Sequence, residues 1–160
     1  MVSSDYEELF STLNAHKIKY LVVGAHAVAF YAQPRFTKDL DVWVPTALTD
    51  SQRIYDALKA YGAPLRGLTP KNFAKPGIIL QIGVAPVRVD IMTEVSGVRV
   101  EEAWKNRVKS RYGKTSIHVL GLPELIKTKE AAGRPQDKLD LAKLRKFDAA
   151  QEDHDFSAQK

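Results

Sequence analysis

The chain has 160 residues, of which 44% are hydrophobic and 27% charged, a composition typical of one soluble globular domain. It contains no cysteine, which excludes disulfides and thiolate metal sites and indicates a reducing compartment. The formal net charge of +5 favours polyanionic partners such as RNA, DNA or nucleotides. Neither a secretory signal nor a run long enough to span a membrane is visible, so we expect a cytoplasmic protein with no membrane partner.

The first elements are predicted to be a helix, a strand and a second helix. Apolar residues at three- and four-residue spacing predict a helix over Ser4–Lys17. A buried strand over Ile18–Val23 ends at Gly24, and a short helix over Ala25–Tyr31 follows. Because the first N–H groups of a helix have no partner within it, this turn is a candidate cradle for phosphate. An ordinary strand-to-helix turn is the commoner case for a lone glycine.

Two carboxylates alternate with apolar residues in the next strand. An irregular connection over residues 33–38 leads into a predicted strand, Asp39–Val44. Alternation puts Asp39 and Asp41 on one face with their Cβ atoms about 6 to 7 Å apart. Two acids this close raise each other's pKa unless a cation lies between them, and oxygen ligands favour Mg²⁺ or Mn²⁺. A solvated acidic face is the alternative, but the strand, turn and helix that precede the pair favour a metal site.

The middle of the chain is predicted to contain a helix, one helical turn within a loop, and the two strands of a hairpin: Ser51–Tyr61, Pro70–Phe73, Ile78–Ile82 and Val87–Met92. The last strand also alternates, which places Asp90 near its end. Asp90 is therefore a third carboxylate that could lie beside Asp39 and Asp41. The alternative is a surface acid or a partner for Arg88.

The remaining elements are predicted to be a helix, a strand and two helices: Val100–Val108, Thr115–Leu120, Glu124–Ala131 and Gln136–Phe147. On the last helix, the leucines at 139 and 144, with either Leu141 or Ala142, are expected to face the core. Asp137 and Asp140 are three residues apart and share a face. We interpret residues 1–148 as a single domain and residues 149–160 as a polar, disordered tail.

These residues form a pattern that resembles the nucleotidyltransferase superfamily typified by DNA polymerase beta. The motifs, in chain order, are Gly24-Ala25, thirteen residues and Asp39-Leu40-Asp41; then Val87-Arg88-Val89-Asp90-Ile91; then Lys129, Arg134, Asp137 and Asp140. The run Arg35-Phe36-Thr37-Lys38-Asp39-Leu40-Asp41 is similar to small bacterial and archaeal nucleotidyltransferases related to abortive-infection toxins. Ala25 departs from the second Gly or Ser of the signature. The resemblance implies an α/β (α+β) nucleotidyltransferase fold, with a small mixed β-sheet flanked by helices and the C-terminal helices packed alongside.

The resemblance also implies a reaction and a set of roles. A nucleoside triphosphate would give its nucleoside monophosphate to an acceptor hydroxyl, and pyrophosphate would leave. Asp39 and Asp41 would hold two Mg²⁺ or Mn²⁺ ions, and Asp90 would bind the ion next to the attacking hydroxyl and assist its deprotonation. The further implied roles are phosphate binding by the amides of Gly24 and Ala25, a triphosphate or leaving-group contact by Lys129, phosphate contacts by Arg35 and Arg134, orientation of the metal strand by Thr37, and anchoring of the two C-terminal cations by Asp137 and Asp140.

The sequence does not identify the acceptor. Toxin-like relatives modify RNA, especially tRNA ends, whereas others modify a partner protein or an antibiotic; the basic C-terminal helices favour RNA. A small antitoxin or partner subunit could supply acceptor binding or neutralise a toxin. Two alternatives are an inactive module of this fold that binds nucleotide or a partner protein, and a plain nucleic-acid-binding domain. The intact set of three carboxylates favours the enzyme.

Overall fold

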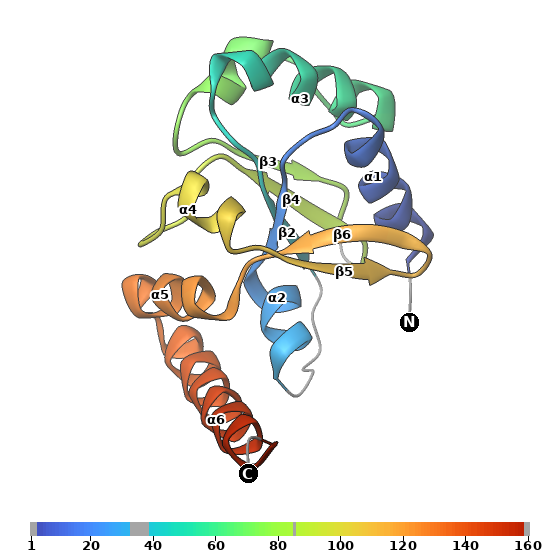
Figure 1. Cartoon of the computed structure of the whole chain (residues 1–160). Helices are drawn as coiled ribbons and strands as arrows, with labels where there is room; N and C mark the ends of the chain where they lie inside the picture. Colours follow the sequence, from blue (N-terminus) through green and yellow to red (C-terminus); the bar gives the residue numbers. More distant parts are fainter. Residues whose placement is uncertain (1–2, 33–38, 85, 159–160) are drawn as a thin grey trace.

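A six-stranded mixed sheet forms the centre of the protein (Figure 1). The structure is a computed structural model that describes residues 3–32, 39–84 and 86–158. The strands are β1 (Leu21–Val23), β2 (Asp39–Trp43), β3 (Ile79–Ile82), β4 (Arg88–Met92), β5 (Val108–Tyr112) and β6 (Thr115–Val119). They lie in the order β3-β4-β2-β1-β6-β5, with β2 parallel to β4 and β1 parallel to β6. The other neighbouring pairs are antiparallel.

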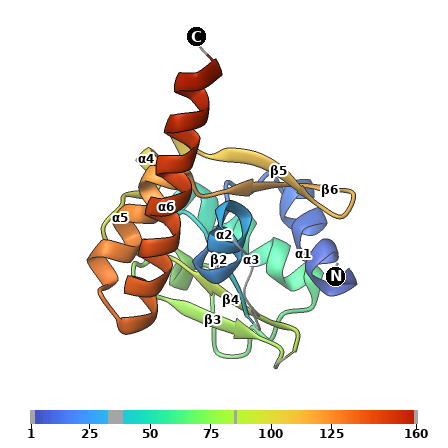
Figure 2. The same ribbon diagram turned by 90° about the horizontal axis from the view of Figure 1, so that it is seen from below.

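Helices flank this sheet. They are α1 (Ser4–Ala15), α2 (Gly24–Tyr31), α3 (Leu48–Tyr61), α4 (Val100–Lys105), α5 (Leu122–Ala132) and α6 (Pro135–Ala158), with a 3₁₀ turn η1 (Pro70–Ala74). Figure 1 shows α1 and α3 at one end of the molecule and α2, α5 and α6 at the other, and Figure 2 views the molecule from this second end. In the described part of the chain, no helix is both long and apolar enough to cross a membrane. The arrangement confirms the predicted class, a mixed α/β sheet with the C-terminal helices alongside.

Alternating side chains explain how the sheet carries both a core and a set of acids. On β2, Leu40 and Val42 are almost completely buried, whereas the two aspartates of the strand are partly exposed. On β4, Val89 and Ile91 are buried in the same alternating pattern. Burying these four aliphatic side chains stabilises the sheet by roughly 1.5 to 3 kcal/mol each. Because successive residues of a strand point to opposite faces, the same burial fixes the direction of the intervening acids.

Two sequence predictions about the C-terminal half were wrong. The helix predicted over Val100–Val108 ends at Lys105, and residues 108–112 form the edge strand β5. The sequence did contain the alternation typical of a strand, because Val, Ser and Tyr alternate with Lys and Arg over residues 108–112. Gly113, with a φ of +60°, occupies the two-residue turn before β6, where glycine is favoured.

The last helix also differs from the prediction. Helix α6 continues to Ala158, whereas we expected it to end at Phe147 and a disordered polar tail to follow. Leu139, predicted to face the core, is 61% exposed. Leu144 is buried as predicted, and Asp137 and Asp140 are buried beside it. The prediction for Leu139 failed because two of the inward positions carry acids, and the side chain of Lys129 neutralises them.

Candidate active site

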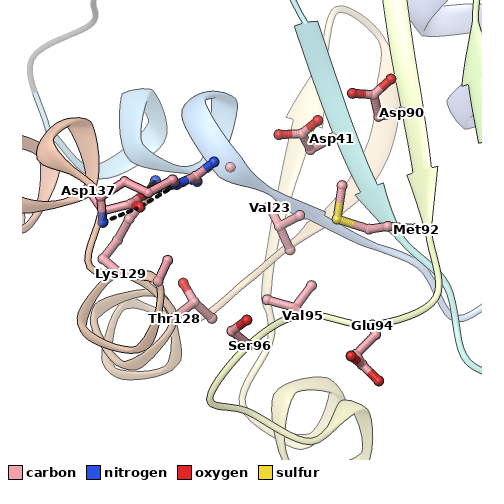
Figure 3. Close-up of a pocket in the computed structure, with 13 residues that line it drawn as sticks. Val23, Asp41, Asp90, Met92, Glu94, Val95, Ser96, Thr128, Lys129 and Asp137 are labelled. Atoms are coloured by element: carbon pink, nitrogen blue, oxygen red, sulfur yellow. Dashed lines mark hydrogen bonds and ion pairs between the residues drawn. The ribbon is translucent and has the colours of Figure 1, made fainter. Parts of the chain in front are cut away.

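Parallel pairing of β2 and β4 brings the predicted carboxylates together. Asp41 lies directly opposite Asp90 in the register, and Asp39 lies opposite Arg88. Asp39 and Asp41 of β2 and Asp90 of β4 therefore point to the same face of the sheet. Figure 3 shows the carboxylates of Asp41 and Asp90 beside each other at one side of a pocket. The sheet thus assembles acids that lie 49 positions apart in the numbering, Asp41 and Asp90.

Arg88 supplies the positive charge next to these acids. Its Nε donates to Oδ1 of Asp90 and its second guanidinium nitrogen donates to Oδ2, both over 3.1 Å. The same Nε lies 3.9 Å from Oδ2 of Asp39. The alternative considered for Asp90, a partner for Arg88, is therefore realised in this structure. Because a guanidinium can pair with a carboxylate bidentately, Arg88 balances part of the negative charge of the cluster.

Within the described residues, Asp41 has no such direct partner, and its pKa is strongly raised. Burial, followed by the negative charges of Asp90 and Asp39, raises the pKa of Asp41 from 3.8 to about 6. The positive charges of Lys129 and Arg88 offset only part of this effect. A carboxylate that ionises against burial and two like charges is a position where an added cation would be strongly favoured.

Gly24 is required where β1 meets α2. Its φ is +67°, in the left-handed region that glycine adopts without strain. A Cβ added there would lie 3.0 Å from Cγ of Asp41. The carboxylate of Asp41 therefore packs directly against the backbone at the start of α2, and any side chain at position 24 would displace it. Ala25 follows in the first turn of α2, with its N–H at the open end of the helix.

A buried ion-pair network faces the acids from α5 and α6. Lys129 donates to Oδ1 of Asp137 at 3.1 Å, and its Nζ lies 3.1 Å from Oδ2 of Asp140. Arg134 donates from Nε to Asp137 at 2.7 Å. Burial alone would raise the pKa of Asp137, but hydrogen bonds from Arg134 and Lys129 lower this pKa to about 2. Asp137 thus pairs with both Lys129 and Arg134, and Asp140 pairs with Lys129.

The turn between α5 and α6 produces this network. Gly133 adopts a φ of +64° and ends α5, and Pro135 begins α6. The last turn of α5 therefore lies against the first turn of α6, which brings Lys129 within reach of the two aspartates. An acid in the first turn of a helix is also favoured by the helix dipole.

A pocket of about 320 Å³ separates the carboxylates from this network (Figure 3). Its walls come from the end of β1, from β2 and β4, from the turn after β4, and from α5 and the start of α6. Among the described residues, the predicted site residues that line it are Gly24, Asp41, Asp90, Lys129, Arg134 and Asp137. Ala25, Asp39 and Asp140 are neighbours of these residues and do not line the pocket. Arg35 and Thr37 lie outside the described residues.

Sequence reasoning missed one wall of the pocket. Glu94, Val95 and Ser96, in the turn after β4, line it together with Thr128 of α5. Gly97 lets this turn approach α5, since a Cβ there would lie 2.8 Å from the Cβ of Ala131. The position of these residues just beyond the end of an acid-bearing strand was the available signal.

The comparison with known families decides the identity of this arrangement. Residues 2–155 match the family model described as "Nucleotidyl transferase of unknown function (DUF2204)". The chain belongs to this nucleotidyl transferase family. The match spans both acid-bearing strands and the two C-terminal helices, so the recognised superfamily and the assignment as an enzyme of the nucleotidyltransferase type are confirmed.

Solved structures show the same fold at low sequence identity. The lincosamide antibiotic adenylyltransferase LnuA, solved with lincomycin bound, is 12% identical, with a TM-score of 0.58 over 91% of this chain and 98% of that one. A putative nucleotidyltransferase from Thermotoga maritima is also 12% identical, with a TM-score of 0.53 over 100% of this chain and 97% of that one. No curated protein sequence matches this chain significantly. These similarities establish the fold, whereas the substrate has to be inferred from the site.

The carboxylates of this nucleotidyl transferase have the chemistry of ligands for a hard divalent cation, although within the described residues they are not gathered around one ion site. Asp39, Asp41 and Asp90 offer carboxylate oxygens, the ligands that Mg²⁺ and Mn²⁺ prefer. The guanidinium of Arg88 lies beside the carboxylates of Asp39 and Asp90 and neutralises part of their charge. Within residues 3–32, 39–84 and 86–158, no three acidic or histidine side chains are positioned around one ion site. Asp90 pairs with Arg88 instead, so its carboxylate would have to turn from Arg88 toward an ion.

Proposed function

We propose that this protein transfers a nucleoside monophosphate from a nucleoside triphosphate to an acceptor hydroxyl, with two Mg²⁺ or Mn²⁺ ions held by Asp39, Asp41 and Asp90. The observation that carries the proposal is the pocket itself. The neighbouring carboxylates of Asp41 and Asp90 lie on one side of a pocket of about 320 Å³. Lys129 and Arg134 line the other side of this pocket. That arrangement offers sites for divalent cations on one side and for phosphate on the other.

In the proposed reaction, the acceptor oxygen forms a bond to the α-phosphorus while the bond from that phosphorus to the bridging oxygen of the β-phosphate breaks. Pyrophosphate carries away the electron pair, and Asp90 takes the proton of the hydroxyl. The bound ions supply charge neutralisation for the attacking and leaving oxygens. Because the chemistry depends on in-line positioning, the rigid β2–β4 pair is a suitable support for the acids.

The remaining residues bind the triphosphate. The N–H groups of Gly24 and Ala25, at the start of α2, hold the β- and γ-phosphates. Lys129 and Arg134 approach from α5 and the start of α6, and Arg134 is the more accessible, with a side chain 75% exposed. Asp137 positions the side chains of Lys129 and Arg134, and Asp140 positions that of Lys129. Arg35 and Thr37 stay predictions as phosphate contact and strand-orienting residue.

We favour RNA, in particular a tRNA end, as the acceptor, because the chain is basic overall. A small-molecule hydroxyl is the second candidate, since one structural neighbour is an antibiotic adenylyltransferase. Membership of a toxin–antitoxin pair, a small partner subunit and a cytoplasmic location stay predictions.

The test supplies each α-³²P nucleoside triphosphate with Mg²⁺ or Mn²⁺ to the protein in the presence of total tRNA, a lincosamide, or neither. The control is the double variant Asp39→Ala/Asp41→Ala, and Asp56→Asn is the matched exposed-acid variant. Label in one acceptor that is lost in the double variant and kept in Asp56→Asn supports the proposal. If no acceptor is labelled and calorimetry detects no metal-dependent nucleotide binding, the proposal is refuted.

A further inference from the structure

The β5–β6 hairpin carries positive charge without any acid. Residues 103–123 include no Asp or Glu, and they contain five basic residues: Lys105, Arg107, Lys109, Arg111 and Lys114. Over the whole chain, 24 basic residues are accompanied by 19 acidic ones. The complete absence of acids from this hairpin is therefore a local feature, which the active site does not use.

Two exposed cations of the hairpin, Lys109 and Arg111, have no acidic partner within the described residues, whereas the backbone N–H of Lys114 donates to the carboxylate of Glu7. Lys109 and Arg111 are exposed, two residues apart on the edge strand β5, with roughly 7 Å between them. Neither takes part in any of the ion pairs of the described residues, whereas Arg53, Lys127 and Arg145 all have acidic partners. Cations held on a rigid strand without partners are available to an external anion.

Protection of the sheet edge does not by itself account for the absence of acids from residues 103–123. Charged side chains on an edge strand prevent another strand from pairing with it. Lysine is especially common in this role, but a surface usually mixes acids with cations, and residues 103–123 contain no acid. The positive charges alone indicate a polyanionic partner.

An exposed aromatic side chain lies next to the hairpin. Phe30 of α2 is 43% exposed, and it lines a groove of about 210 Å³ together with Arg111 and His26. Figures 1 and 2 show α2 adjacent to the β5–β6 hairpin. Aromatic rings beside cations form stacking platforms for single-stranded nucleic acid. An acidic polypeptide has no bases that could stack on this ring, so the ring favours a nucleic acid as the partner.

Helix α2 also connects this groove with the candidate active site. Gly24 at its first residue lines the active-site pocket, and Phe30 lies six residues further along the same helix. At 1.5 Å per residue, these positions are about 9 Å apart along the helix axis. A nucleic acid bound at the groove would thus have an end within reach of the pocket.

We infer that Phe30, Lys109, Arg111 and Lys114, here called the hairpin surface, bind single-stranded RNA: the three cations contact phosphates and Phe30 stacks on a base. The inference deepens the proposed function, because it assigns a binding surface to the acceptor. The binding itself requires neither nucleoside triphosphate nor metal, so it can be tested separately from the reaction.

The experiment measures binding of a fluorescently labelled single-stranded RNA by anisotropy, in EDTA, over a range of salt concentrations. The variants are Lys109→Glu/Arg111→Glu, Phe30→Ala, and, as a control of equal charge change, Lys138→Glu/Lys143→Glu on exposed positions of α6. We expect the hairpin double variant to bind at least tenfold more weakly and its salt dependence to fall by about 1.4 in log–log slope. Phe30→Ala should weaken binding about fivefold or more without changing that slope. The control should bind within twofold of the unmodified protein.

Equal losses in the hairpin and α6 variants, no binding by the unmodified protein, or equally tight binding of polyglutamate would each overturn the inference. The two proposals can fail separately. RNA binding that depends on the hairpin surface, without any nucleotidyl transfer, would refute the proposed reaction alone. Transfer to RNA with an unchanged KM in Lys109→Glu/Arg111→Glu would refute the hairpin surface alone. Since both positions are exposed, circular dichroism should show unchanged folding.

Discussion

Replacing Asp41 by asparagine should stabilise the metal-free protein. Asp41 is buried beside two other acids, and its pKa is raised to about 6 from an ordinary value of 3.8. The folded state therefore holds the proton of Asp41 more tightly than the unfolded chain does. This contribution to stability is complete below about pH 4 and is lost as the pH rises through about 6.

The magnitude follows from the difference between the two pKa values. About two pKa units at 1.36 kcal/mol each give roughly 3 kcal/mol of stability lost by the unmodified protein at neutral pH. Asparagine has the same shape as aspartate and never ionises, so it avoids this loss and keeps the contact with Gly24. The Asp41→Asn variant should accordingly be more stable by up to about 3 kcal/mol at pH 7.5, and equal in stability near pH 4.

Urea denaturation in EDTA between pH 4 and pH 8 would measure the difference. Asp56→Asn, which removes an exposed acid of α3, is the control and should change stability by less than about 0.5 kcal/mol at any pH. Added Mn²⁺ should stabilise the unmodified protein and have little effect on Asp41→Asn. An Asp41→Asn variant that is no more stable than the unmodified protein at pH 7.5 would refute the reasoning.

Three further substitutions test the surroundings of the acids. Gly24→Ala should cost about 2 to 4 kcal/mol in urea denaturation, since it combines a left-handed alanine with a clash against Asp41; a neutral result would contradict the close contact. Lys129→Met leaves two buried carboxylates without their lysine and should cost about 3 to 5 kcal/mol in the same assay, with Lys138→Met near zero as its control. Arg88→Gln removes the cation that competes with a metal ion for Asp90, so Mn²⁺ should bind about tenfold more tightly. This change is equivalent to one charged hydrogen bond of about 1.5 kcal/mol. Electron paramagnetic resonance would follow the Mn²⁺ titration in the absence of nucleotide. Weaker Mn²⁺ binding would show that Arg88 supports the ion site.

Local pattern was sufficient for the elements that carry the acids. The alternation of Asp39-Leu40-Asp41-Val42 predicted both the strand and its buried face, and Leu40 and Val42 are buried as expected. Pro135 and Gly133 likewise marked the boundary between the two C-terminal helices. These predictions succeeded because strand alternation and helix termination depend on neighbouring residues.

Local pattern failed where a distant partner changed the preference of a residue. On α6, Asp137 and Asp140 are buried and Leu139 is exposed, because Lys129 of the preceding helix neutralises the two acids. On β5, packing against β6 through a tight turn at Gly113 overrode the helical interpretation of residues 106–108. In both cases the deciding contact involves another element.

The sequence by itself determined the acids and their faces, since these are encoded by spacing and side-chain chemistry within a few residues, and the fold class followed from the resemblance of its motifs to a known superfamily. Only the tertiary structure decided what these acids meet. The parallel register of β2 and β4 sets Asp41 opposite Asp90, which raises the pKa of Asp41, and it lets Arg88 approach Asp39. Such contacts depend on which strands become neighbours, and strand order is settled by packing of the whole chain.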